Sequence, residues 1–541
     1  MSYANKKRDI LLPLLIASAL IIGILIGLQL RENDMKRTRL FSSKSDKLNA
    51  IMNFIEEEYV DTIAKDSLIE KTIPLMMSNL DPHSVYIPAK EIEAVNESLD
   101  GEFSGIGVEF NMPNDTVVVL NTIPGGPSEK VGIMSGDRIV RINDTLVAGI
   151  KFPQDQIMRK LRGKTGTKVR IGVKRPGVAK LIAFTISRDK IPVKSVDVAY
   201  MIEPAVGYIK VSKFAKETHK EFAEALNKLQ NEGMKKVIVD LRGNSGGYLD
   251  QAVEIVNEFL PEGKLIVYTQ GKNRPRQSLY SDARGSAKDI ELYVLIDEES
   301  ASASEIVAGA IQDNDRGTII GRRSFGKGLV QEQASLTDGS ALRLTVARYY
   351  TPTGRSIQKP YTLGNGTDYY MDLNNRYLHG EMATQDSIKL NEKEKFITPG
   401  GKTVYGGGGI MPDIFVPLDT VGVGKFYRKI YEQSLIFKFT TEFTDTHREE
   451  LQQITTIKEL KRYIAKQNLM AKFLSYAAKN GVFPAGNELN QSYKLIDAQL
   501  KAFVGRNTKL NDEGFYPFIE PIDNVLNRTV KEIHKKPISK K

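Results

Sequence analysis

The spacing of hydrophobic positions changes several times along the chain, and each change indicates a different kind of structure. The apolar positions in residues 31–100 recur at helical spacing, so a helical region is predicted there: Leu48, Ile51, Met52, Ile55, Tyr59 and Val60. From Gly101 the pattern changes to short β-rich runs separated by glycines. Candidate strands lie at 107–110, 116–120, 138–142, 168–173 and 181–187, with one helix near 153–161.

From about Lys194 onward, apolar runs alternate with segments of helical periodicity. Residues 236–241 and 291–296 are typical of buried strands, and residues 249–260 and 302–312 of helices. This alternation predicts an α/β core over residues 194–418. Residues 359–396 are polar and irregular, which predicts a surface insertion, and residues 419–541 are helical again.

The longest uncharged run lies near the N-terminus, from Ile10 to Leu30. As a helix rising 1.5 Å per residue it would reach roughly 30 Å, the thickness of a bilayer's hydrocarbon core. A cleavable signal peptide is the alternative, but its apolar region is normally shorter and no small-x-small cleavage site follows. We therefore predict a cytoplasmic tail at 1–9 and an uncleaved transmembrane signal anchor at 10–30. Basic residues flank the run on both sides, so the positive-inside rule does not set its orientation.

Composition adds several exclusions. The chain has 541 residues, 41% of them hydrophobic and 26% charged, as expected for a folded protein of several domains. The absence of cysteine excludes disulfides and thiolate catalysis. The five histidines lie far apart without metal-ligand spacing, so we expect no metal site and no cofactor, and they argue against a Ser-His-Asp triad. The net charge of +10 is spread along the chain, which indicates a solvated basic surface and no nucleic-acid partner.

The residues best suited to take part in catalysis lie between 240 and 331. Ser300, Ser302 and Ser304 fall at the start of a predicted helix, where unpaired N–H groups and the helix dipole favour an anion. Lys327 follows between two glycines, and burial there would depress the pKa of its amine. A neutral lysine can take the proton of a serine hydroxyl and make it a nucleophile. Spacing alone does not choose among the three serines.

Simpler interpretations exist for the same residues. Ser302 and Glu305 match the capping box of an ordinary helix, and a lysine between glycines is usually a solvated loop residue. The glycines of 243–247 follow a predicted strand and could leave backbone N–H groups open to a developing negative charge. Gln331 could hydrogen-bond the Lys327 amine and orient it, either if the segment 327–331 is helical or if it is a loop that bends back on itself.

The β-rich module opens with a two-glycine turn, FSGIGV at 103–108. Such a turn either closes tightly or points several N–H groups at one carboxylate. The strings PGGPSEKVGI at 124–133 and GDRIVRIN at 136–143 resemble the central segment of a bacterial PDZ domain. The resemblance implies binding of a peptide C-terminus with an apolar last residue, with four residues of the turn as the peptide-binding loop: Gly105, Ile106, Gly107 and Val108.

Four strings of the core resemble the carboxy-terminal processing peptidases, also called tail-specific proteases: DLRGNSGG at 240–247, SASASEIVA at 300–308, GRRSFGKGLVQ at 321–331 and YYTPTGR at 349–355. The string GGIMPD at 408–413 also fits. The resemblance implies a serine/lysine dyad, with Ser302 as nucleophile, Lys327 as general base and Gln331 orienting the lysine. The backbone N–H groups of Gly246 and Ala303 would form the oxyanion hole. The insertion and the tail after 420 match nothing in the family's minimal pattern.

The expected fold class is therefore an α/β (α+β) peptidase core of the crotonase-like type, with an inserted PDZ domain at 101–193 and helical N- and C-terminal regions. The expected function is a membrane-anchored serine endopeptidase that recognises substrate C-termini and cleaves through an acyl-enzyme. We expect a single pass through the inner (cytoplasmic) membrane, a periplasmic catalytic part, protein or peptide substrates, and a homo-oligomer. The alternatives are a catalytically silent, membrane-tethered PDZ scaffold and a signal-peptide-cleaving serine/lysine protease, which would not require a PDZ domain.

Overall fold

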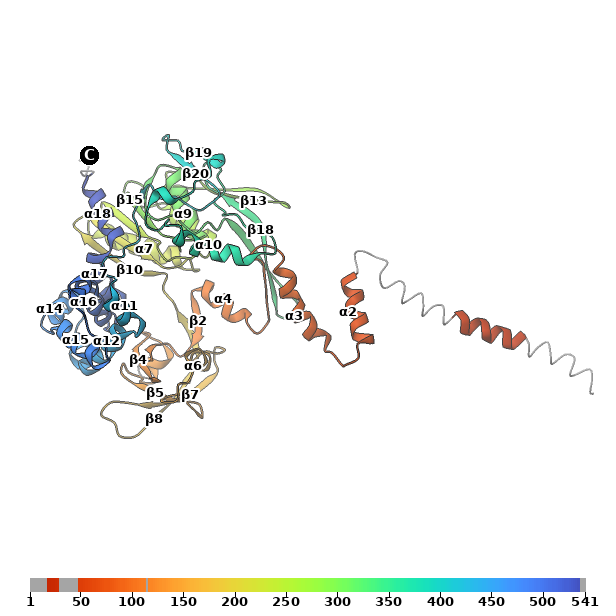
Figure 1. The fold of residues 1–541 in the computed structure, drawn as a ribbon, viewed down its shortest axis with the longest axis horizontal. Coiled ribbons are helices and arrows are strands. Elements are labelled where there is room, and N and C mark those ends of the chain that lie inside the picture. Colours follow the sequence, from red (N-terminus) through yellow and green to blue (C-terminus); the bar gives the residue numbers. More distant parts are fainter. Residues whose placement is uncertain (1–16, 29–46, 113–114, 536–541) are drawn as a thin grey trace, which may run out of the picture. The chain divides into compact units, whose positions relative to one another are not determined.

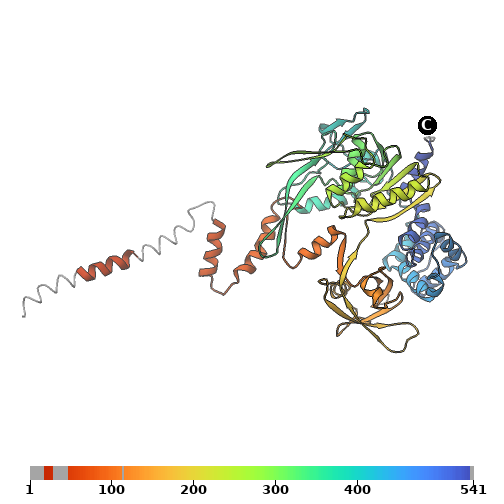
Figure 2. The ribbon, with the colours of Figure 1, turned by 180° about the vertical axis from the view of Figure 1, so that it is seen from behind.

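The computed structural model describes residues 17–28, 47–112 and 115–535. The chain forms two compact units, residues 1–80 and residues 81–541. Figure 1 follows the elements of both units in colour from red to blue, and Figure 2 shows the same ribbon from behind.

The first unit is helical where it is described. A helix covers residues 17–28, and α2 (Lys47–Glu58) and α3 (Lys65–Met77) follow. The Lys65 ammonium joins the two helices by donating to Asn53 and Glu56, each at 2.8 Å. Residues 10–16 and 29–30 of the predicted anchor lie outside the described residues. Over the described ranges, no helix combines the length and the apolar character needed to cross a membrane.

The second unit begins with β1 (Val85–Ile87) and α4 (Ile92–Asp100) and continues into the β-rich module. Strands β2 (Glu102–Gly105) and β9 (Asp189–Pro192) pair antiparallel where the chain enters and leaves the module. Between them lies an antiparallel sheet in the order β3-β4-β5-β7-β8, with β6 added to β5. The module's elements are β3 (Val108–Asn111), β4 (Val117–Thr122), α5 (Pro127–Lys130), β5 (Arg138–Ile142), β6 (Thr145–Leu146), α6 (Gln154–Leu161), β7 (Lys168–Lys174) and β8 (Ile182–Ser187).

These bounds confirm the five strands and the helix predicted from the apolar pattern, each to within two residues. The inward positions carry β-branched residues, which suit a pleated, half-buried surface. They pack with two residues of α6 into one core: Val117, Val119, Ile139, Ile142, Val169, Ile171, Val173, Ile157 and Leu161.

A six-stranded sheet forms the centre of the larger domain, in the order β10-β11-β12-β15-β16-β21. Strand β10 pairs antiparallel with β11, and all later pairs are parallel. The strands are β10 (Val196–Glu203), β11 (Val206–Val211), β12 (Lys236–Asp240), β15 (Glu291–Ile296), β16 (Gly317–Gly321) and β21 (Ile414–Phe415). The predicted α/β core is confirmed.

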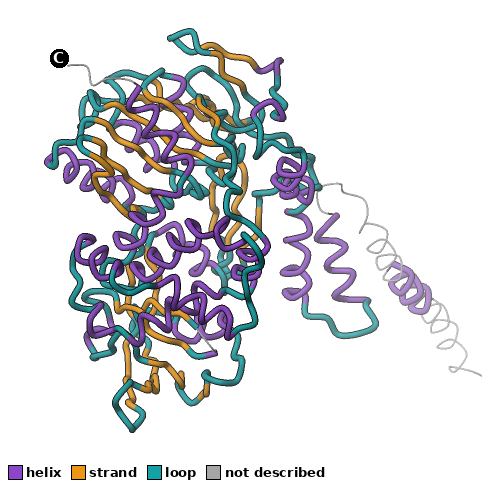
Figure 3. The backbone as a smooth tube through the Cα atoms, turned by 60° about the vertical axis from the view of Figure 1, so that its left-hand side comes forward, coloured by secondary structure: helices purple, strands orange, loops and turns teal. Residues whose placement is uncertain are grey.

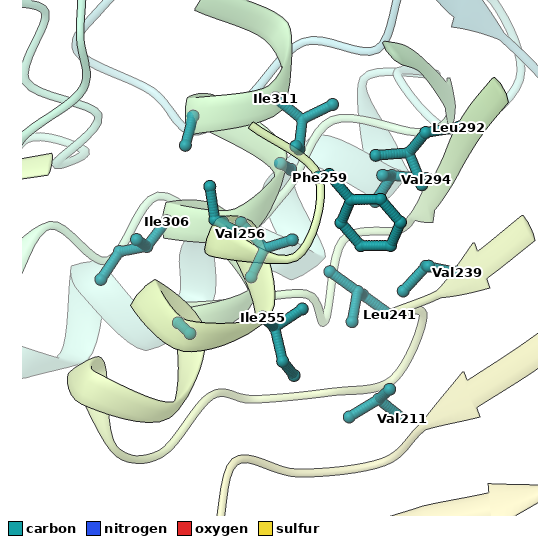
Figure 4. Close-up of a cluster of buried hydrophobic side chains, with 14 of the residues drawn as sticks. Val211, Val239, Leu241, Ile255, Val256, Phe259, Leu292, Val294, Ile306 and Ile311 are labelled. Carbon is teal, nitrogen blue, oxygen red and sulfur yellow. The ribbon is translucent and has the colours of Figure 1, made fainter. Parts of the chain in front are cut away.

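Both faces of this sheet are covered, which explains why its strands are apolar at nearly every position. Three helices cover one face: α7 (Thr218–Asn231), α8 (Leu249–Asn257) and α9 (Ala303–Asp313). Figure 4 shows how Ile255 and Val256 of α8 and Ile306 of α9 gather beside the strand residues Val239 and Val294. Alternate residues of the same strands, Ile238 and Leu295 among them, point to the other face because side chains alternate along a strand.

A second sheet is antiparallel and has the strand order β1-β18-β13-β14, with β17 added to β18. Its further strands are β13 (Leu265–Gly271), β14 (Arg274–Tyr280), β17 (Leu329–Ser335) and β18 (Ala341–Tyr350). Strand β1 comes from residues before the β-rich module, since Val85 pairs with Arg343. The segment 81–87 is therefore part of the peptidase core.

The insertion at 359–396 is more regular than the sequence predicted. It contains a 13-residue helix, α10 (Gly366–Leu378), whose Tyr369 and Arg376 are buried. Two short 3-10 turns, η2 (Gln385–Ser387) and η3 (Glu392–Glu394), lead to a hairpin of β19 (Lys395–Ile397) and β20 (Thr403–Tyr405). Most of its residues are exposed, as expected for a surface insertion, but the prediction that it is irregular was wrong, because it contains α10 and part of the hairpin.

The tail is helical, as predicted, and Figure 3 shows its purple helices together with the orange strands of the rest of the unit. Its first six helices share a core of their own: α11 (Lys425–Glu432), α12 (Leu435–Thr446), α13 (Arg448–Leu451), α14 (Ile457–Ala465), α15 (Leu469–Lys479) and α16 (Glu488–Arg506). After α17 (Asp512–Ile519) and η4 (Glu520–Ile522), the last helix α18 (Asn524–Lys535) returns to the central sheet. Its Val525, Leu526 and Ile533 are buried on the second face of that sheet.

Candidate active site

A cleft of about 1140 Å³ brings together most of the catalytic residues predicted from the sequence. Ser302, Lys327, Gln331 and Gly246 all line it. They come from four places: the start of α9, the loop before β17, β17 itself and the loop after β12. The four residues of the predicted peptide-binding loop do not belong to the lining of this cleft.

Ser302 has a backbone conformation that side chains rarely adopt, with φ 55° and ψ −112°. It immediately precedes α9, and its N–H donates to the Glu305 carboxylate at 2.9 Å. Glu305 in turn donates its N–H to the Ser302 carbonyl, also at 2.9 Å. Strained conformations of this kind persist only where the surrounding structure fixes them, and they cluster at functional sites.

The structure distinguishes among the three serines that spacing alone could not rank. The Ser300 hydroxyl is fully buried and donates to the Leu241 carbonyl at 2.9 Å. The Ser304 hydroxyl is also fully buried and donates to the Asn244 carbonyl at 2.8 Å. Both hydroxyls hold the loop after β12 in place, whereas Ser302 faces the cleft.

Gly246 touches the serine so closely that no other residue fits. A Cβ atom built on it would lie 2.7 Å from the Ser302 Cβ and 3.0 Å from the Ala303 nitrogen, and its φ is +102°. The Ala303 N–H is at the first position of α9, where a helix has no carbonyl of its own to accept it. The Gly246 N–H, however, donates to the Asn244 side chain at 2.9 Å. Of the two predicted oxyanion donors, Gly246 is thus engaged elsewhere in this conformation.

Glu305 connects the serine to the lysine loop, a role that the capping-box pattern did not reveal. Its carboxylate is completely buried and accepts from Ser324 Oγ at 2.5 Å, from the Gly326 N–H at 2.7 Å and from the Lys327 N–H at 2.8 Å. Burial raises the pKa of Glu305 to about 7, and these hydrogen bonds act in the opposite direction. The carboxylate therefore fixes the backbone of Lys327 relative to that of Ser302.

Lys327 has the electrostatic surroundings expected of a lysine base. Burial lowers the pKa of its ammonium, and the nearby Arg343 lowers that pKa further. The carboxylates of Glu305 and Asp81 act in the opposite direction. The Tyr349 hydroxyl contacts the carbonyls of both Ser302, at 3.1 Å, and Lys327, which ties the two backbones together a second time.

Gln331 lies in strand β17 and not in a helix, and a β-bulge at Val330 and Gln331 interrupts its pairing with β18. A bulge of this kind re-aims side chains, and it directs the Gln331 amide toward the cleft. The amide donates to Thr345 Oγ1 at 3.3 Å, and Thr345 donates to Asp81 at 2.9 Å. The helical alternative considered for Gln331 was wrong.

Asp81 was not identified from the sequence as a residue of the site. Its carboxylate is buried and also accepts from the Ser84 hydroxyl at 2.5 Å and from the His83 N–H at 2.9 Å. Burial lowers the pKa of the neighbouring His83 to about 4, and the positive charge of Lys327 contributes to that decrease. A proline-containing turn far upstream of the serine thus belongs to the surroundings of the lysine.

The insertion braces the loop that carries Lys327. The Arg376 guanidinium of α10 donates to the carbonyls of Arg323, at 2.7 Å, and Ser324, at 3.0 Å. The Lys359 ammonium lies 3.8 Å from the centre of the Phe325 ring. These contacts fix the residues just before the lysine.

The predicted peptide-binding loop lies at the start of β3, which is an edge strand of its sheet. Gly107 has a φ of +71°, and a Cβ atom there would lie 3.0 Å from Ile191. The Ile106 carbonyl accepts from the Ser128 N–H at 3.0 Å. The unpaired side of β3 has the form needed for an extended peptide to add as a further strand. Across the ranges that the structure describes, no cluster of His, Asp and Glu suits a metal ion.

Comparison with known proteins places this geometry in a family. Residues 205–368 match the model of peptidase family S41, residues 104–186 match the PDZ domain model, and residues 426–508 match a family of unknown function (DUF8443). The chain is 38% identical over 313 residues to the "Carboxy-terminal-processing protease" of Bartonella bacilliformis, covering 57% of this chain and 71% of that protein. It is 33% identical over 350 residues to the "Carboxy-terminal processing protease CtpB" of Bacillus subtilis, covering 62% and 72%.

Among solved structures, the photosystem II D1 C-terminal processing protease has 25% identity and a TM-score of 0.37, covering 70% of this chain and 88% of that one. The peptidase match covers Ser302 and Lys327 of the core, and the PDZ match covers the β-rich module that precedes it. The chain therefore belongs to peptidase family S41, as a serine-type peptidase related to the carboxy-terminal processing proteases and carrying a PDZ domain.

Proposed function

We propose that the protein is an endopeptidase with a Ser302/Lys327 dyad. Neutral Lys327 takes the proton of Ser302 Oγ as that oxygen attacks the peptide carbonyl, and the lysine then gives the proton to the departing amine. Water attacks the resulting acyl-enzyme with the same base, and the carboxylic product leaves. The observation that carries this proposal is the single buried carboxylate of Glu305, which accepts from the N–H groups of both Ser302 and Lys327 beside the cleft.

The oxyanion hole of this mechanism would consist of the Ala303 and Gly246 N–H groups. Because the Gly246 N–H donates to Asn244, that peptide group must turn before it can meet a developing oxyanion. We therefore propose that the described conformation is a resting state and that substrate binding completes the site.

The PDZ domain would supply the substrate by pairing its C-terminal residues with β3. Helix α4 offers a physical connection from that domain to the cleft. Its Glu97 accepts from the Ser104 N–H of β2 at 2.9 Å and pairs with Arg162 at 3.3 Å. The adjacent Asn96 accepts from Gln333 of β17 at 3.4 Å and lines the cleft. A bound C-terminus could shift the population of the active conformation through these contacts.

A membrane-anchored form with a periplasmic catalytic part remains our proposal for the whole chain, supported by the uncharged run at 10–30. We expect the full-length chain to stay with membranes after an alkaline carbonate wash and a chain lacking residues 1–30 to be released. Release of the full-length chain would contradict an anchor. A homo-oligomer is proposed as well, and sedimentation equilibrium of the full-length chain at several concentrations distinguishes it from a monomer.

Removal of either dyad residue should abolish proteolysis. Ser302→Ala removes the nucleophile and Lys327→Ala the base, and we expect each to reduce kcat/KM about 1000-fold or more. Hydrolysis of an unstructured protein measures the loss. Ser475→Ala is the matched control, because this exposed serine of α15 donates to the Ala471 carbonyl within its own helix. Wild-type activity in the Ser302 or Lys327 variant would refute the dyad.

The pH dependence of kcat/KM should respond to the charges around Lys327 in opposite directions. The base acts when neutral, so activity rises with pH through the lysine pKa. Asp81→Asn removes a negative charge that favours the ammonium, so the pKa falls and the rise moves to lower pH. Arg343→Gln removes a positive charge that disfavours it, so the rise moves to higher pH. We expect shifts of about half a pH unit each.

Both variants keep the Glu305 and His83 side chains, and loss of the Asp81 charge lowers the pKa of His83 further, away from the titration of the lysine. Asp338→Asn, on the exposed turn before β18, is the control and should leave the profile where it is. Shifts of the two test variants in the same direction would show that Lys327 is not the group whose titration limits activity.

Capture of substrate C-termini predicts that the free carboxylate matters. A peptide ending in an apolar residue should bind about tenfold or more tightly than the same peptide with a C-terminal amide, since charged hydrogen bonds contribute most to such a site. Fluorescence anisotropy with the Ser302→Ala chain measures both affinities without cleavage. Equal affinities would exclude recognition of the chain end.

A further inference from the structure

A second pocket, of about 280 Å³, lies at the carboxyl ends of β11 and β12 and is lined by charged residues that the proposed mechanism does not use. Lys210, Asp240 and Arg242 come from the peptidase core, while Glu520 and Asp523 come from the tail. The pocket therefore marks a place where the tail meets the start of the loop that carries Gly246. Residues 242–247 are called the glycine loop below.

Arg242, the first residue of the glycine loop, is held between two carboxylates. Its NH1 and NH2 groups donate to the two oxygens of Asp523, at 2.9 and 2.7 Å. The Nε and NH2 groups also donate to Asp240, at 3.0 and 2.6 Å. A bidentate pair of this kind fixes the direction of the guanidinium as well as its position. The Arg242 and Asp523 side chains are 17% and 15% exposed, so solvent screens the pair little.

A short stretch with several hydrogen bonds leads from Arg242 to the glycine beside the serine. The next residue, Gly243, donates its N–H to Asp297 at 2.9 Å, and the Asn244 carbonyl accepts from the Ala301 N–H at 3.0 Å. The Asn244 side chain then accepts from the Gly246 N–H. Only three residues thus separate Arg242 from Gly246, the glycine that packs against Ser302. The Gly246 peptide group must therefore turn while these hydrogen bonds hold the neighbouring residues in place.

Asp523 is itself placed by α18. Its carboxylate accepts from the Leu526 N–H at 2.9 Å and so caps the start of that helix. At the other end of α18, the buried Lys236 ammonium donates to the Ile533 carbonyl at 3.1 Å. Leu526 and Ile533 are buried against the central sheet. Because α18 is held at both ends, the Asp523 carboxylate is a rigid anchor.

We propose that Asp523, at the start of the last helix of the tail, is a positioning residue that sets the glycine loop through Arg242 so that the Gly246 N–H can reach the oxyanion. This inference rests on the proposed function of Gly246. It makes the C-terminal segment part of the catalytic architecture, although that segment lies outside the match to the peptidase family model.

The variant Asp523→Asn isolates the charge. Asparagine caps a helix as well as aspartate does, so α18 should still begin at the same residue. We expect kcat to fall about tenfold with KM within about twofold, a partial form of the loss seen when an oxyanion donor is displaced. The affinity for a peptide boronate, whose adduct with Ser302 carries the negative charge of the transition state, should fall in parallel. The midpoint of the pH profile should not move, because Lys327 is unaffected.

Asp497→Asn is the matched control, since this carboxylate pairs with Lys501 within α16, at 2.6 Å. Both variants are prepared as full-length chains, and urea unfolding checks that their midpoints agree before their activities are compared. If the Asp523→Asn variant does not fold, Asp523→Ser takes its place as the test variant, because serine also has a side-chain oxygen that can cap the helix. Turnover and boronate affinity equal to those of the control would overturn the proposal. Wild-type activity of Ser302→Ala would instead overturn the proposed function, so the two failures are distinguishable.

Discussion

The active-site region depends on the buried carboxylate of Glu305. A carboxylate without access to water is tolerated only when its oxygens are fully hydrogen-bonded. Glu305 meets that requirement with donors from Ser302, Ser324, Gly326 and Lys327. A chain that buries this residue must therefore bring the lysine loop to the start of α9. The approach of the Lys327 backbone to the Ser302 backbone follows from satisfying this one carboxylate.

The strained backbone of Ser302 and its contact with Gly246 lie within the region that the Glu305 hydrogen bonds hold together. The left-handed φ of the serine raises its side chain into the cleft, while the two flanking serine hydroxyls turn inward and bind backbone carbonyls. A glycine is required at 246 because a Cβ would collide with the serine. The site combines a strained serine that faces the cleft with a glycine whose N–H donates to Asn244.

The insertion and the tail, which match nothing in the family's minimal pattern, also support the active-site region. Helix α10 of the insertion donates to carbonyls just before Lys327, and α18 of the tail covers the second face of the central sheet. A doubly covered parallel sheet needs an apolar layer on each side, and the family core supplies helices for only one of them. The tail is thus a structural component of the peptidase domain.

The sequence by itself determined the elements and the strings that resemble the carboxy-terminal processing peptidases. Apolar periodicity is a local property, so five strands of the PDZ domain and the alternating core could be located to within a few residues. Spacing alone left three serines open, and the family resemblance indicates Ser302. The inward orientation of the other two hydroxyls, the strand conformation of Gln331 and the direction of the Gly246 N–H required the tertiary structure. Each depends on partners that no local pattern encodes.

The same physical reason explains the residues that sequence reasoning missed. Asp81 meets Thr345 across 264 residues of chain, and Arg242 meets Asp523 across 281. Aspartates in a turn and before a helix have ordinary local roles as turn and capping residues, and both perform those roles here. Their second role arises only when folding removes them from water beside a lysine or an arginine. The sequence specified the groups that can react, and the fold decided which charges surround them.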